Sequence, residues 1–343
     1  LCDEYRSKDG GYDCIIGGSG GKDSVFQSHM LKYKYNMKPL TVTWAPHIYT
    51  EIGFKNFQNW IHIGGFDNYL YTPNGKIHRK LTREATKNLL HPFQPFIIGQ
   101  KTFVVKMACK LNIPLIFYGE MPGEYGRKIS HKTNHLSLNK ENIKQQGYRL
   151  DPLEGKEFIE TYLGGKKVKH YLEEGINLND LDSYRPESPD IIKKKKIEFH
   201  FLGYYLRFVP QENYYFAVDK VDFTANPERT EGTYSKYNSI DDKLDGFFYY
   251  TRFIKFGVGR AMMDSAQEIR NGHIDRKEGL ALIEKFDGEY PTKYENEFLK
   301  YISMTKNEFI EICDTFRPDH LWKKKSNRWE LKLTPAQYFN KIV

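Results

Sequence analysis

The sequence predicts an α/β protein with a parallel, doubly wound sheet, followed by a mainly helical C-terminal part. Short apolar runs alternate with amphipathic segments in the first third of the chain, and strands that alternate with helices form parallel sheets. The last third contains two capping-box patterns, Asp275 to Glu278 and Thr305 to Glu308, which are typical of helix starts. Strands are expected at 14–16, 40–44, 67–71 and 113–118, and helices at 24–35, 50–61, 82–90 and 99–111.

The stretch from Tyr12 to Ser24 is the centre of this prediction. An apolar strand at 14–16 leads into four glycines and then into a helix. A glycine turn between a strand and a helix start gathers main-chain N–H groups and the positive end of a helix dipole, so it favours an anion. Lys22 is followed by Asp23, which excludes a Walker loop, and the spacing from Gly18 excludes a dinucleotide fingerprint. The alternative is a plain glycine-rich turn.

Composition limits the function classes. The chain has 343 residues, of which 39% are hydrophobic and 28% charged, as expected of a soluble globular protein. We expect a cytoplasmic location, because four cysteines are too few for a disulfide framework and neither a signal peptide nor a membrane span is visible. The net charge of +8 suits anionic ligands such as nucleotides. The basic run 193–196 is interpreted as a solvated linker rather than a nucleic-acid patch.

Several side chains follow the predicted strands at the edge where parallel sheets bind ligands. Trp44 ends the second strand and is expected either to flank a nucleotide base or to pack in the core. Glu120 and Glu124 follow the fourth strand. They are candidates to hold Mg²⁺, which prefers oxygen ligands, with solvated loop acids as the alternative.

Two further groups of charged residues lie in the C-terminal part. Asp241, Asp242 and Asp245 share one face near a helix start, where acids are also stabilised by the helix dipole alone. The side chains of Arg260, Asp264 and Glu268 recur every four residues, so they line one helical face and could equally form an ion-pair ladder. Residues 131–195 are interpreted as an insertion or lid with some helix, and the periodicity of 200–208 leaves strand and helix both open.

The segment Ser19 to Ser24 is similar to the SGGxDS loop of PP-loop ATP pyrophosphatases. Residues 12–126 and 230–322 together resemble the N-acetyl sugar amidotransferase family, including enzymes of the pseudaminic acid and diacetamido-mannuronic acid type. The blocks that carry the resemblance are Ser19–Ser24, Tyr118–Glu120, Glu124–Gly126, Gly232–Tyr237, Ser239–Asp245, Lys255–Arg260, Glu268–Arg270 and Phe286–Pro291.

This resemblance implies an adenine nucleotide alpha hydrolase-like sheet and three regions. Residues 1–10 would be the remnant of an N-terminal cysteine module, 11–150 the ATP-binding domain, and 151–343 a mainly helical substrate and partner region. Cys2 would be a zinc ligand only if further cysteines lie upstream of Leu1.

The resemblance also implies the reaction. ATP and Mg²⁺ would activate an acetamido group of a nucleotide sugar as an adenylated imidate, which ammonia converts to an acetamidino group, in the synthesis of lipopolysaccharide O-antigen or flagellin glycan. Ammonia would come from a glutaminase subunit through a (β/α)₈ subunit, with no membrane or nucleic-acid partner. The alternative is a PP-loop tRNA-modifying enzyme of the lysidine synthase or thiolase type.

Roles of individual residues follow from the same resemblance. Ser19, Gly20, Gly21 and Ser24 would hold pyrophosphate, Lys22 would supply positive charge, and Asp23 would order the loop or share Mg²⁺ with Glu120. Residues expected on the ATP or sugar side are Glu124, Asp241, Asp242, Arg260, Glu268 and Arg270.

Overall fold

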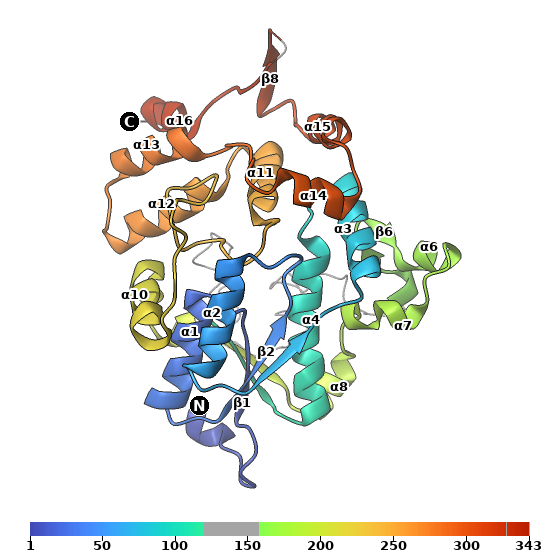
Figure 1. Cartoon of the computed structure of the whole chain (residues 1–343), viewed down its shortest axis with the longest axis vertical. Coiled ribbons are helices and arrows are strands. Elements are labelled where there is room, and N and C mark those ends of the chain that lie inside the picture. Colours follow the sequence, from blue (N-terminus) through green and yellow to red (C-terminus); the bar gives the residue numbers. More distant parts are fainter. Residues whose placement is uncertain (120–157, 327, 343) are drawn as a thin grey trace.

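A parallel sheet forms the centre of the computed structural model, which describes residues 1–119, 158–326 and 328–342 (Figure 1). Within these residues the sheet has the strand order β3-β2-β1-β4-β7, and all neighbouring strands are parallel. The strands are β1 (Cys14–Gly17), β2 (Pro39–Trp44), β3 (Asn68–Tyr71), β4 (Leu115–Tyr118) and β7 (Glu198–Phe201). The predicted α/β class and its four predicted strands are therefore confirmed.

Helices cover both faces of the sheet. Successive strand residues point to opposite sides, so a strand of apolar residues presents apolar side chains to helices on both faces. Ile15 packs into a cluster with Val104 and Val105 of α4, whereas the adjacent Ile16 packs with Leu31 on the other face. The first-face helix is α4 (Gln94–Leu111), and the second face carries α1 (Lys22–His29), the π-helical turn η2 (Met30–Lys34), α2 (Glu51–His62) and α10 (Pro210–Val221). The arrangement is consistent with a doubly wound fold.

Two helices begin earlier than predicted. The helix α3 (Gly75–Leu89) begins after Asn74, whose side chain accepts a hydrogen bond from the main-chain N–H of Lys76 at 3.0 Å. Pro95 occupies the first turn of α4, where its missing N–H costs no hydrogen bond. The expected helix at 24–35 is present but changes from α to π geometry at Met30. At 200–208, left open between strand and helix, β7 runs into the short helix α9 (Leu202–Tyr205).

Residues 158–195 pack onto the outer helices. They comprise η4 (Phe158–Glu160), β5 (Tyr162–Leu163), β6 (Lys166–Lys167), α6 (Val168–Glu173), α7 (Leu178–Leu181), η5 (Asp182–Tyr184) and α8 (Pro189–Lys194). Tyr171 and Tyr184 are fully buried, in one cluster with Trp44 and Leu81. This part of the expected insertion is therefore integrated into the core.

The C-terminal part is mainly helical, as predicted. It contains α11 (Asp245–Phe256), α12 (Arg260–Asn271), α13 (Arg276–Phe286), α14 (Glu295–Ile302), α15 (Lys306–Thr315), the hairpin of β8 (Trp322–Lys325) and β9 (Arg328–Leu331), and α16 (Pro335–Ile342). Both predicted capping boxes are confirmed. The rings of Phe247 and Phe298 stack at 3.8 Å, in a cluster that includes Leu90 and Phe93 beside the start of α4. None of the described helices is both long and apolar enough to cross a membrane.

Candidate functional site

The glycine loop, residues 17–24, follows β1 at the point where the strand order reverses, since β1 lies between β2 and β4. Crevices at such switch points bind ligands in open α/β sheets. Gly20 has φ +83°, and a Cβ there would lie 2.7 Å from Cα of Phe57. A Cβ at Gly18 would lie 2.7 Å from Oγ of Ser24, which accepts a hydrogen bond from the N–H of Ser19. Only glycine fits these two positions.

Gly21 differs from Gly18 and Gly20. It is the N-cap of α1, and the nearest heavy atom to an added Cβ would be Oγ of Ser19 at 3.6 Å. The loop and the first turn of α1 line a cavity of about 770 Å³, within the roughly 300–1,000 Å³ of small-molecule sites. The main chain at Gly21 is thus open to a ligand at a helix N-terminus, which is the geometry that suits a phosphate.

Lys22 and Asp23 form an ion pair inside this cavity. Lys22 Nζ lies 2.6 Å from Oδ2 of Asp23, and Asn213 Nδ2 donates to Oδ1 at 2.9 Å. Lys22 is 7% exposed, so its charge acts in a partly desolvated site. Asn213, at the start of α10, fixes the Asp23 carboxylate, and no motif in the sequence predicts that role.

The predicted acids Asp241, Asp242 and Asp245 line the same cavity as the glycine loop. Burial and the charge of Asp242 raise the pKa of Asp241, while a hydrogen bond with Ser19 and the charge of Lys22 act in the other direction. Burial, with Asp241 and Asp242 nearby, raises the pKa of Asp245 to about 8. Asp245 is therefore protonated at neutral pH and can donate a hydrogen bond.

Asp242 is held by the segment that follows β2. Its Oδ2 accepts from the main-chain N–H of His47 at 2.7 Å and lies 2.7 Å from Nδ1 of the same residue. Its Oδ1 accepts from the N–H of Leu244 at 3.0 Å. The segment after β2 and the segment before α11 are thereby held together.

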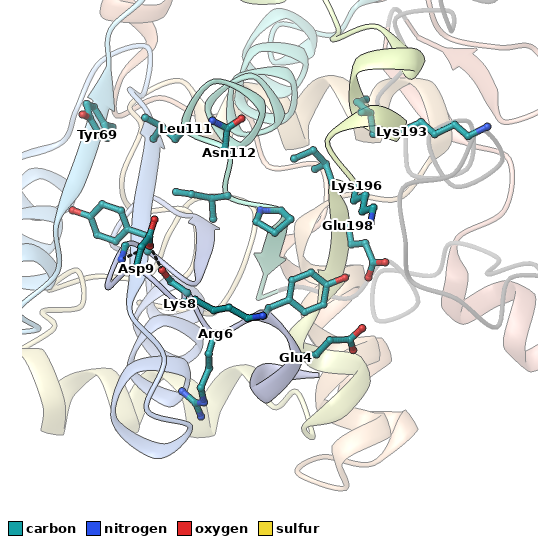
Figure 2. Close-up of a pocket in the computed structure, with 18 of the residues that line it drawn as sticks. Glu4, Arg6, Lys8, Asp9, Tyr69, Leu111, Asn112, Lys193, Lys196 and Glu198 are labelled. Carbon is teal, nitrogen blue, oxygen red and sulfur yellow. Dashed lines mark hydrogen bonds between the residues drawn. The ribbon is translucent and has the colours of Figure 1, made fainter.

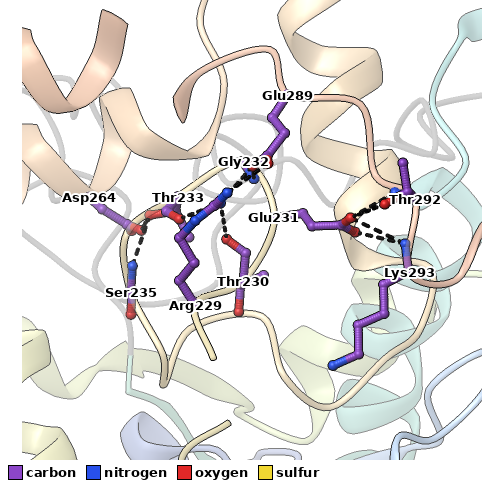
Figure 3. Close-up of polar contacts among 10 residues, drawn as sticks. All are labelled: Arg229, Thr230, Glu231, Gly232, Thr233, Ser235, Asp264, Glu289, Thr292 and Lys293. Atoms are coloured by element: carbon purple, nitrogen blue, oxygen red, sulfur yellow. Dashed lines mark hydrogen bonds and ion pairs between the residues drawn. The ribbon is translucent and has the colours of Figure 1, made fainter. Parts of the chain in front are cut away.

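The chain segment before these acids is braced by polar contacts (Figure 3). Arg229 forms two ion-pair contacts with Glu289, at 2.6 and 2.7 Å, and Glu289 also accepts from the N–H of Gly232. Glu231 accepts from the N–H and the hydroxyl of Thr292. Blocks that lie about 60 positions apart in the sequence meet here. None of these residues lines the cavity, so they brace the segment behind its wall.

Residues 231–334 match the family model described as LPS biosynthesis protein WbpG-like, C-terminal domain. No match is found among the curated proteins. The matched residues, called the WbpG-like segment below, include the three acids, α11 to α15 and the β8–β9 hairpin. The C-terminal part of the chain is thus similar to a family of lipopolysaccharide biosynthesis.

Within the WbpG-like segment, α12 brings only part of the predicted set to the cavity. Arg260 lines it, its guanidinium packs over the ring of Tyr249 at 4.7 Å, and its Nε lies 3.0 Å from Asp264. Glu268 instead pairs with Nδ1 of His273 at 2.5 Å. Neither Glu268 nor Arg270 lines the cavity, and Arg270 is exposed. The Arg260–Asp264 pair of the predicted ion-pair ladder is therefore present.

Another predicted residue, Trp44, is not brought to the cavity. Trp44 is 3% exposed and packs against Tyr71 and Tyr184, which agrees with its alternative of core packing. Glu120 and Glu124 lie outside the described residues.

The described residues provide few ligands for the predicted Mg²⁺ and Zn²⁺ sites. Within 1–119, 158–326 and 328–342, no group of three or more His, Cys, Asp or Glu could hold a metal ion. Mg²⁺ is often bound through one or two carboxylates together with substrate phosphates, so Asp23 beside the glycine loop fits it. Cys2, in η1 (Cys2–Tyr5), packs against the cluster of Cys14 and Leu31. Burial raises the pKa of its thiol, which disfavours the thiolate that binds zinc.

Other lining residues were missed at the level of sequence. Lys101 comes from α4, and Arg252 and Lys255 come from α11. The signal that could have found the last two is helical spacing, because they continue the face that begins at Asp245.

A second hollow of about 1530 Å³ lies at the opposite end of the sheet (Figure 2). Glu4, Arg6 and Lys8 of the N-terminal segment line it together with Lys193 and Lys196 of the basic run. Charges of both signs alternate on its walls, and no residue of the glycine loop reaches it.

Proposed function

We propose that the protein is an ATP-dependent amidotransferase that converts an acetamido group of a nucleotide-activated sugar to an acetamidino group, for a bacterial surface polysaccharide. The observation that carries this proposal is the glycine loop with its Lys22–Asp23 pair, which lines one cavity together with three acids of the WbpG-like segment. The loop suits a polyphosphate, and the matched family suggests a sugar of lipopolysaccharide biosynthesis.

In the proposed reaction the amide oxygen attacks the α-phosphate of ATP, which gives an O-adenylated imidate and pyrophosphate. Ammonia then adds to the imidate carbon and AMP leaves, so the amide oxygen departs on AMP. The N–H groups of the loop and the ammonium of Lys22 would stabilise the charge that develops on pyrophosphate. Asp23, with Glu120 as the further candidate, would hold Mg²⁺, which supplies additional positive charge.

Asp241 and Asp245 would act on the substrate side of the cavity. Protonated Asp245 can donate a hydrogen bond to a sugar hydroxyl or carbonyl, and Asp241, next to it, can accept one. Arg260, on the same wall, can bind an anionic group of either substrate.

Ammonia would come from a partner glutaminase, through a (β/α)₈ subunit. The cysteines support this part of the proposal, since Cys14, Cys109 and Cys313 are buried and burial raises the pKa of each thiol. A glutaminase nucleophile needs the opposite, an accessible thiol with a lowered pKa.

The test supplies the purified chain with ATP, Mg²⁺ and an acetamido nucleotide sugar, and either ammonium chloride or glutamine. Mass spectrometry should find a product in which NH replaces one oxygen, with ammonium but not with glutamine alone. Efficient use of glutamine by the isolated chain would refute the proposal that ammonia comes from a partner glutaminase. Modification of tRNA, with no sugar product under either condition, would replace this proposal by the tRNA-modifying alternative.

A further inference from the structure

One face of α11 lines the cavity from end to end. The lining residues of α11 lie on one side of the helix: Asp245, Phe248, Tyr249, Thr251, Arg252, Lys255 and Phe256. Lys255 lies ten positions after Asp245, which corresponds to about 15 Å along the helix axis. The cavity therefore has two ends, one at each terminus of α11, with room for separate ligand groups.

The two ends differ in charge. The acids that line the cavity among the described residues, Asp23, Asp241, Asp242 and Asp245, all lie at the glycine-loop end. The C-terminal end of α11 instead contributes Arg252 and Lys255. An anion at the second end would meet positive charge without facing those carboxylates.

Lys255 carries the strongest evidence. Its side chain is half-buried, and its Nζ donates to the carbonyl of Leu89 at 2.9 Å. Burial alone lowers its pKa to about 8, with no carboxylate of the described residues acting against it. This hydrogen bond caps the C-terminal end of α3 and uses one of the three N–H donors of the Lys255 ammonium. A half-buried ammonium without a carboxylate partner is stabilised by an anion from the ligand.

Phe256 adds an apolar surface at the same end. Its ring is 59% exposed although it lines the cavity, next in sequence to Lys255. Exposed aromatic rings beside cations suit a ligand that combines a flat ring with negative charge, as a nucleoside diphosphate does.

We propose that the C-terminal end of α11 forms a second phosphate subsite that binds the nucleoside diphosphate group of the co-substrate. This rests on the proposed function only in naming that co-substrate a nucleotide-activated sugar. ATP would occupy the glycine-loop end, so the sugar would extend from the second subsite towards the α-phosphate between the two ends.

The test measures binding, not turnover. The protein is saturated with α,β-methylene ATP, which occupies the glycine loop, and is titrated calorimetrically with UDP, GDP, CDP and dTDP. We expect at least one of the four to bind. Lys255→Ala and Arg252→Ala should each weaken that binding roughly tenfold or more, the size typical of a lost charge-assisted hydrogen bond, and leave affinity for the ATP analogue nearly unchanged. Lys255→Arg should restore most of the affinity.

The matched control is Lys106→Ala. Like Lys255, Lys106 is a partly buried lysine, but it lies on α4 and pairs with Asp182 at 3.0 Å outside the cavity. Its loss should therefore affect the binding of neither ligand. A thermal melt shows whether Lys255→Ala folds. If it does not fold, the nucleotide affinities of Arg252→Ala and Lys255→Arg test the subsite instead.

Three results would overturn the subsite: no binding of any of the four nucleotides, equal loss of both ligands in the variants, or binding of inorganic pyrophosphate as tight as that of the best nucleotide. The last result would assign the cations to a free diphosphate. If a nucleoside diphosphate binds as expected but ATP is not converted to AMP in the full reaction, the proposed function fails and the subsite stands.

Discussion

The buried ring of His47 lies 2.7 Å from the carboxylate of Asp242, although 195 positions separate the two residues in the sequence. His47 follows β2, and Asp242 precedes α11 in the WbpG-like segment. Since Asp242 also accepts from three main-chain N–H groups, those of His47, Ile48 and Leu244, this one carboxylate joins the sheet to the helical part.

Asp242→Ala should lower the free energy of unfolding by about 3 kcal/mol, because it leaves buried donors without their acceptor. Urea denaturation measures the change. The matched control is Asp241→Ala at the adjacent, less buried position, which should cost less than about 1 kcal/mol. Equal losses of stability in the two variants would contradict the bridging role of Asp242.

The loop glycines provide a second matched pair. Gly20→Ala should destabilise the protein by about 1–3 kcal/mol and abolish ATP binding, because φ is positive there and Cβ would strike the main chain at Phe57. Gly21→Ala should keep the melting temperature, since its Cβ meets only Oγ of Ser19 at 3.6 Å, but should weaken ATP binding by obstructing the open main chain. The loop geometry would be refuted by a Gly20→Ala variant that binds ATP normally.

Asp23→Ala should reduce turnover roughly 100-fold or more, since it removes an ordering carboxylate and a candidate Mg²⁺ ligand. Its fold should persist, because the side chain lies in a polar cavity. Steady-state rates at saturating ATP, together with a circular dichroism spectrum, measure both effects. Asp219→Ala, an exposed acid on α10 paired with Lys220, is the control and should keep full activity. Near-normal turnover of Asp23→Ala would exclude the role.

The strands and the glycine loop could be predicted because their patterns are local. The apolar run of β1, the glycines after it and the capping boxes each identify an element from a few neighbouring residues. Residues 158–195 were harder, because Tyr171 and Tyr184 are buried by contacts with α3 and α4 that lie far away in the sequence.

The site was predictable only in part, for the same reason. Asp241, Asp242 and Asp245 could be placed together near a helix start, and all three line the cavity, although only Asp245 belongs to α11. The spacing places Arg260, Asp264 and Glu268 on one face of α12, but of these three only Arg260, at the start of the helix, lines the cavity. Asn213 and His47 belong to no motif, so only the fold brings them to Asp23 and Asp242.

The raised pKa of Asp245 predicts a pH dependence of stability. Between its ordinary value of 3.8 and about 8, the folded protein binds a proton that the unfolded chain has lost. The folded state is therefore favoured at low pH, and this contribution disappears as the pH rises to about 8. Asp245→Asn removes the titration, so the stability of the variant relative to the parent should increase between about pH 5 and about pH 9. Urea midpoints at both pH values measure this, and an unchanged difference would contradict it.

The central claim is that the glycine loop supports cleavage of ATP between its α and β phosphates. The most direct measurement follows ATP labelled separately at the α and γ positions, with Mg²⁺, ammonium and an acetamido nucleotide sugar, and separates the products by chromatography. We predict that label from the α position appears in AMP and label from the γ position in pyrophosphate, in proportion to the acetamidino product. Release of ADP and inorganic phosphate during turnover would contradict the account.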